Sequence, residues 1–147
     1  MASLEELLAD TQSEMIAVCV EYADGAASDI VVYASVEDRT LFFDPFFVVR
    51  GKVVTRGELP EADTSIPRQR AMVKYGNEQL RRLYDAGEDS GFAVPTQLKL
   101  RYSVQSGSLD AEFEYEPQYS HDESLDSSVL SSSWQSEVQT LLDEEQH

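Results

Sequence analysis

The stretch LKLRYSVQSGSLDAEFEYE, residues 98–116, decides the fold of this chain. Apolar and polar side chains alternate on both sides of Ser106-Gly107, which is typical of two antiparallel strands joined by a two-residue turn. Pairing about that turn opposes apolar residues on one face and opposite charges on the other: Val104 with Leu109, Leu100 with Phe113, Arg101 with Glu112, and Lys99 with Glu114. The stretch therefore predicts a half-buried β-hairpin with an acidic outer strand.

The residues before the hairpin predict further elements. Ser3 and Glu6 form a capping-box pattern for a helix that reaches about Met15. Alternating apolar residues predict strands over 16–23 and 29–36, and an apolar stretch with four phenylalanines predicts strand over 41–49. We expect those phenylalanines to fill a core on both faces of the sheet; the alternative is an exposed apolar patch that marks an interface. We expect Pro45 to mark a bulge or a strand start. A tight turn at Arg50-Gly51 leads into a strand over 52–55.

Two more helices complete the expected fold. Thr64 or Ser65 can cap a helix that ends near Gly87, and apolar residues at helical spacing predict another from Leu130 to Leu141, docked through Trp134. Residues 118–128 form a polar loop and residues 143–147 an acidic C-terminal tail. Residues 1–147 are thus predicted to be a single α+β domain of order α-β-β-β-β-α-β-β-α, with an antiparallel sheet and helices packed mainly on one face.

Charge narrows the class of partner. Among 147 residues, 28 Asp and Glu stand against 11 Lys and Arg, for a formal net charge of −17. Apolar residues make up 41%, enough for a folded core, so the chain is not a disordered acidic tail. Duplex DNA and anionic membranes are polyanions, so we expect neither direct nucleic-acid binding nor membrane binding. The N-terminus lacks a signal-peptide pattern and no apolar run is long enough to span a membrane, so a cytoplasmic location is expected.

Few residues could support chemistry. Cys19, the single cysteine, lies in an apolar run and is expected to be buried rather than reactive. The histidines are His121, in an acidic stretch without metal-ligand spacing, and His147. No Gly-rich phosphate loop occurs. We therefore expect no enzyme activity, catalytic residue, metal site or cofactor, and a small enzyme is the least favoured class.

Charge is unevenly spread along the chain. Residues 102–147 contain no Lys or Arg, whereas the second expected helix carries Arg68, Arg70, Lys74, Arg81 and Arg82. Either run can be simply a solvated face of the fold. The functional interpretation of the acidic third is a surface for a basic protein partner, since complementary fields speed association and select partners. The best candidate residues are Asp110, Glu112, Glu114, Glu116, Asp122 and Glu123. The basic helix could bind nucleic acid, but the negative charge of the rest of the molecule opposes this. We expect acidic neighbours in the fold or a partner to neutralise the helix, and in the second case it is the other candidate interface.

The order of motifs resembles a known family. An aromatic strand enters a Gly-Lys turn at residues 46–52, a long helix follows, and the second hairpin strand reads GSLDAEFEYE at 107–116. Over residues 1–142 this looks like the YezG-like immunity proteins of bacterial polymorphic toxin systems. The resemblance implies a cytoplasmic, non-catalytic protein, a monomer or weak homodimer, that binds and neutralises a cognate toxin catalytic domain.

A second class of function stays open. Acidic secretion-system chaperones resemble this chain in size, acidity and the order α-β-β-β-α-β-β-α. Such a chaperone would dimerise and hold an effector client along apolar grooves.

Overall fold

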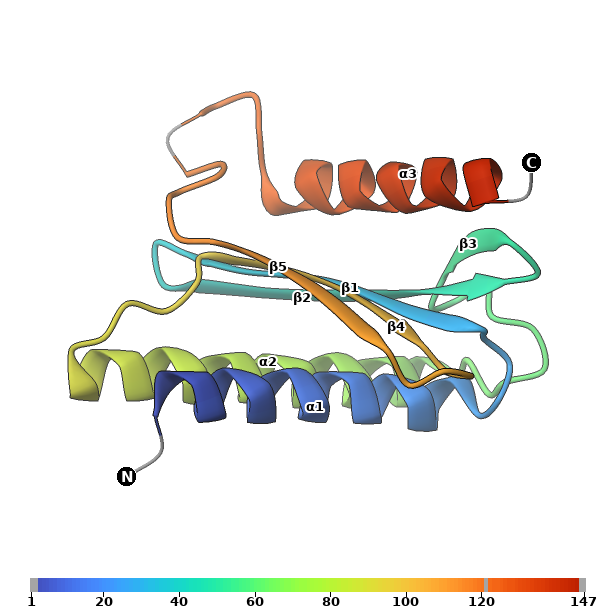
Figure 1. Cartoon of the computed structure of the whole chain (residues 1–147), viewed down its shortest axis with the longest axis horizontal. Coiled ribbons are helices and arrows are strands. Elements are labelled where there is room, and N and C mark those ends of the chain that lie inside the picture. Colours follow the sequence, from blue (N-terminus) through green and yellow to red (C-terminus); the bar gives the residue numbers. More distant parts are fainter. Residues whose placement is uncertain (1–2, 121, 146–147) are drawn as a thin grey trace.

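A five-stranded antiparallel sheet lies between two helices on one face and one helix on the other (Figure 1). The computed structural model describes residues 3–120 and 122–145. Its elements are α1 (Leu4–Ala23), β1 (Asp29–Glu37), β2 (Thr40–Val49), β3 (Lys52–Thr55), α2 (Ile66–Ser90), β4 (Gln97–Ser103), β5 (Leu109–Glu114) and α3 (Ser127–Glu145). The strand order is β3-β2-β1-β4-β5. The predicted α+β class, antiparallel sheet and placement of most helices on one face are confirmed.

The strand predicted over residues 16–23 is wrong, because α1 runs unbroken to Ala23. Ser3 caps this helix as expected, with its Oγ accepting from the N–H of Glu6 at 3.1 Å. The apolar residues of this segment fit both the two-residue period of a strand and the 3.6-residue period of a helix. The helical period prevails because Met15, Ile16 and Cys19 then share one buried face on the sheet. The order of elements is therefore α-β-β-β-α-β-β-α.

The sheet has a core on each face. The larger core joins the sheet to α1 and α2, and the smaller one joins it to α3 through Trp134, Val138 and Leu142. Trp134 is 7% exposed, and its indole N–H donates to the C=O of Val32 at 3.2 Å, so its predicted role as a packing anchor is confirmed.

The phenylalanines of β2 serve both cores, as predicted. Phe43 and Phe47 belong to the larger core and Phe46 to the smaller one, as alternation along a strand requires. Pro45, however, marks neither a bulge nor a strand start, because it pairs in continuous register with Val32. The ladder to β3 begins only at Phe46, so a residue without an N–H is tolerated where β2 is locally an edge.

Helix α2 approaches β2 closely at Gly76. A Cβ built at this glycine would lie 2.3–2.5 Å from three ring atoms of Phe43, which is itself 3% exposed. The glycine inside the helical pattern thus has a packing reason that the sequence alone does not reveal.

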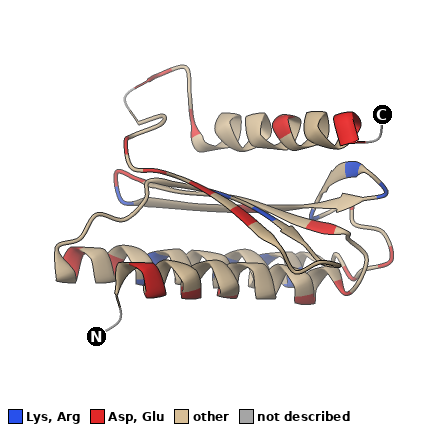
Figure 2. Ribbon diagram, viewed as in Figure 1, with Lys and Arg blue, Asp and Glu red and all other residues tan. Residues whose placement is uncertain are grey.

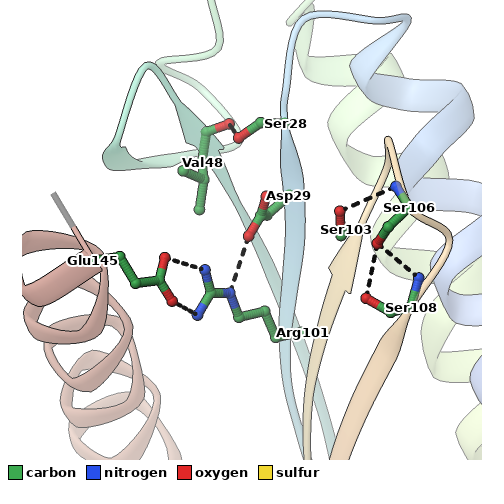
Figure 3. Close-up of polar contacts among 8 residues, drawn as sticks. All are labelled: Ser28, Asp29, Val48, Arg101, Ser103, Ser106, Ser108 and Glu145. Carbon is green, nitrogen blue, oxygen red and sulfur yellow. Dashed lines mark hydrogen bonds and ion pairs between the residues drawn. The ribbon is translucent and has the colours of Figure 1, made fainter.

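The predicted hairpin exists, but its register is shifted by two residues. Leu98 pairs with Phe113 and Leu100 with Ala111, and residues 104–108 form a loop in place of the expected two-residue turn. Serine hydroxyls stabilise this longer loop: Ser103 Oγ accepts from the N–H of Ser106, and Ser106 Oγ from the N–H of Ser108 (Figure 3). A shift of two keeps every side chain on its predicted face.

Candidate protein-binding surface

The edge strand β5 carries three acidic side chains, which we call the hairpin carboxylates: Asp110, Glu112 and Glu114. All three are exposed, and they stand opposite Arg101, Lys99 and Gln97 of β4. Residues that pair directly share a face. Because Leu98 and Leu100 lie in the larger core with α1 and α2, the hairpin carboxylates lie on the opposite face, which α3 partly covers. Figure 2 shows this acidic strand at the front of the sheet.

The cations of β4 pair with other elements rather than with β5. Arg101 donates from Nε to Asp29 at 3.0 Å and from its terminal nitrogens to Glu145 at 3.4–3.5 Å (Figure 3). Lys99 reaches Glu137 of α3 at 3.7 Å and lies 5.3 Å from the centre of the Trp134 ring. The predicted ion pairs of Arg101 with Glu112 and of Lys99 with Glu114 are therefore wrong.

The hairpin carboxylates take no part in the ion pairs that the described residues form on this surface. Among the residues that the structure describes, the ion pairs within 4.0 Å involve Asp29, Asp44, Glu137 and Glu145, and none of the hairpin carboxylates. The expected acidic tail is also revised, since residues 143–145 form the last turn of α3 and Glu145 binds Arg101. Residues 146–147 lie outside the described part of the chain.

The other three candidate residues follow β5 in the chain. Glu116, Asp122 and Glu123 are exposed, in the segment that connects β5 to α3. The Asp122 carboxylate is already engaged locally, because it accepts from the hydroxyl of Ser124 at 2.6 Å and from its N–H at 2.9 Å. These two hydrogen bonds hold the pKa of Asp122 below its usual value. Asp122 therefore shapes the loop, while Glu123 remains a plain exposed charge.

Glu37, a residue that the sequence analysis did not single out, anchors this connecting segment. Its buried carboxylate accepts from the backbone N–H groups of Gln118, Tyr119 and Ser120 at 2.8–3.2 Å. Burial alone would raise the pKa of Glu37, but the three backbone hydrogen bonds outweigh it and hold the pKa below its usual value. No local sequence signal marks the role, because the partners lie more than 80 residues away.

The basic helix forms a separate groove. Arg70, Lys74 and Arg81 of α2 line a groove of about 640 Å³ together with apolar Ile66 and Val73. None of these three cations takes part in the ion pairs of the described residues, so the fold does not neutralise them by direct pairing. The expectation that acidic neighbours pair with the basic helix is not met for them.

A second, mainly apolar groove runs between α1 and the hairpin. It has a volume of about 600 Å³ and is lined by Ser13, Ile16, Ala17, Val20, Glu21, Tyr102, Gly107 and Leu109. Leu109, one of the lining residues, is 37% exposed. The groove therefore meets the acidic edge strand at Leu109, with apolar side chains on the α1 face and carboxylates on the other.

The described residues contain no group of three or more His, Cys, Asp and Glu side chains placed to hold a metal ion. His121 and His147, the histidines weighed above, lie outside these residues. Along the described ranges, no helix combines the length and apolar character needed to cross a bilayer.

No model of a known protein family matches this chain, and no curated protein matches its sequence.

Proposed function

We propose that this protein is a non-catalytic immunity or antitoxin-type protein that binds and neutralises a basic toxin domain through its acidic hairpin surface. The supporting observation is that Lys99 and Arg101, which share a face with the hairpin carboxylates, pair with Glu137, Asp29 and Glu145 instead. Concentrated like charge opposes a compact fold, so three neighbouring exposed carboxylates are best explained by a use in binding.

The physical consequence would be fast and selective association. An acidic surface attracts a basic partner over long range and repels acidic proteins. A toxin domain that acts on nucleic acid presents cations where the phosphates of its substrate bind. Carboxylates spaced along a strand can occupy those positions or the rim beside them, and so block the substrate without any chemistry on the part of this chain.

A secretion-system chaperone is the second candidate, and the order of elements favours it. With residues 16–23 in α1, the order becomes the α-β-β-β-α-β-β-α of such chaperones. A chaperone would be a dimer that binds an unfolded segment, whereas the immunity protein would bind one folded domain as a monomer or weak dimer. Sedimentation of the free protein and of its complex separates the two, because the stoichiometries differ.

The test of the proposed function is charge reversal with a matched control. The partner to be tried is the product of the neighbouring reading frame, produced in a catalytically inactive form if it contains a basic toxin domain; a neighbouring frame without such a domain would speak against the proposal. Glu112→Lys with Glu114→Lys should slow association about tenfold or more at low salt, and the effect should shrink as salt rises. The control is Asp85→Lys with Asp89→Lys, which makes the same change in net charge at exposed positions of α2. Equal effects of both pairs, or an association rate independent of salt, would contradict the proposal.

A further inference from the structure

We propose that β5 is a docking edge, at which an extended basic segment of the partner adds to the sheet as a sixth, antiparallel strand. This inference rests on the proposed function, since it names how the basic partner is held. The segment would alternate apolar and cationic residues. Its apolar side chains would enter the groove beside α1, and its cations would face the hairpin carboxylates. The recognition mode combines backbone hydrogen bonds for affinity with side-chain pockets for specificity.

The backbone geometry supplies the free hydrogen-bonding groups. β5 ends the strand order and pairs with β4 alone. The N–H of Val104 donates to the C=O of Ser28 on the β1 side, whereas the N–H of Ser103 donates to the C=O of Ser108 on the β5 side. Backbone groups of a strand point alternately to its two neighbours, so every second residue of β4 counted from Ser103 points to β5. The partners of these residues in β5 are Asp110, Glu112 and Glu114, whose backbone groups therefore point towards β4. Those of Leu109, Ala111 and Phe113 point outwards, away from the sheet.

The groove between α1 and the hairpin supplies a place for the apolar side chains. Residues 109, 111 and 113 face the α1 side, as their pairing with Tyr102, Leu100 and Leu98 requires. In an antiparallel pair, side chains of directly opposed residues lie on the same face. Apolar residues of an added strand opposite these three positions would therefore lie beside Ile16, Val20 and Leu109, and would cover the exposed part of Leu109.

The hairpin carboxylates decide which strand can be added. Residues opposite positions 110, 112 and 114 would face three carboxylates on the other side, so lysine or arginine is favoured there. The same carboxylates disfavour a second copy of this chain, because antiparallel pairing of two β5 strands would place acidic side chains against acidic side chains. Repulsion between carboxylates thus disfavours pairing of β5 with a second β5, whereas a strand that carries cations is favoured.

The experiment uses the whole protein and a capped peptide in which lysine and valine alternate over eight residues. Two N-methylated forms are its controls, and they have the same composition and charge. Methylation of the valines removes the N–H groups that would face β5, whereas methylation of the lysines removes only groups that face away. We expect the unmodified and lysine-methylated peptides to slow hydrogen exchange at the amides of Leu109, Ala111 and Phe113 by about tenfold or more. The valine-methylated peptide should give no such protection.

A variant of the protein makes the test independent of peptide chemistry. Ala111→Pro removes an outward N–H that the sheet does not use, and proline is tolerated at such edge positions. It should weaken binding of the unmodified peptide about tenfold or more, and so should Glu112→Lys, which leaves the backbone intact.

Two results would overturn the inference: equal binding of all three peptides, or unchanged affinity in Ala111→Pro together with unprotected edge amides. In either case, salt-dependent binding that Glu112→Lys abolishes would leave the proposed acidic surface standing. If the peptide also bound the Glu112→Lys variant with unchanged affinity, both proposals would be contradicted.

Discussion

Replacing Gly76 by alanine sets two effects of opposite sign against each other. Alanine is favoured over glycine inside a helix by about 1 kcal/mol. The added methyl group, however, would lie 2.3–2.5 Å from three ring atoms of Phe43, whereas carbon atoms in contact normally lie about 3.5–4.0 Å apart. The two groups must therefore separate by more than about 1 Å, and Phe43 is buried, so its ring cannot turn into solvent.

The steric effect should prevail. Overpacking a core costs about 1–3 kcal/mol, and contacts this short with a buried ring place Gly76→Ala at the upper end of that range. After the helix propensity is subtracted, we expect a net loss of about 2 kcal/mol in the free energy of unfolding.

Urea unfolding at neutral pH measures this loss as a lower midpoint with an unchanged slope. Gly57→Ala is the matched control, since a Cβ there would meet its nearest neighbour, Gln69, at an ordinary 3.7 Å. The control should be neutral or slightly stabilising. A double variant with Phe43→Leu should recover part of the loss, because the smaller side chain relieves the contact. A gain of about 1 kcal/mol in Gly76→Ala alone would refute the reasoning, because propensity would then outweigh packing.

Two further predictions concern Glu37 and the β4–β5 hairpin. Glu37→Gln should lower the free energy of unfolding by about 1–3 kcal/mol at pH 7, because the backbone donors lose a charged acceptor. Since the pKa of Glu37 is lowered on folding, its contribution is complete above the unfolded pKa of about 4.3 and is lost as the pH falls through the folded pKa. The wild type and the variant should thus converge in urea midpoint at acid pH, and a constant difference would contradict the assignment. Phe113→Ala should cost about 1–3 kcal/mol because the ring packs partly on the larger core, whereas Glu112→Ala should cost under about 0.5 kcal/mol; equal losses would contradict the assigned faces.

The sequence predicted what depends on local periodicity. Alternation along residues 98–116 assigned the faces of the hairpin correctly, because the period of a strand is two. It could not determine the register, since a shift of two residues leaves every face unchanged and the serine-bonded loop selects one of the alternatives. The segment 16–23 satisfied both a strand and a helix pattern, and only packing against the sheet decides between them.

The candidate surface was predictable to the same extent. Exposure of Asp110, Glu112 and Glu114 followed from the pattern of the hairpin. The pairing of Arg101 with Glu145 and Lys99 with Glu137 did not, because it depends on where α3 crosses the sheet. The groove beside α1 could not be predicted from the sequence either, because it forms only when residues 16–23 are helical.

The burial of Cys19 gives the molecule an internal probe of its own opening. The thiol is fully enclosed between α1 and the sheet, and burial raises its pKa far above the usual value. An alkylating reagent can therefore reach it only in the fraction of molecules in which α1 has lifted away. When closing is fast, the labelling rate is proportional to that fraction, and its logarithm measures the free energy of this local opening. Ile16 and Val20 of the same helix line the apolar groove, so a ligand bound there stabilises the closed position of α1. Such a ligand therefore slows the alkylation of Cys19 without contacting its sulfur atom.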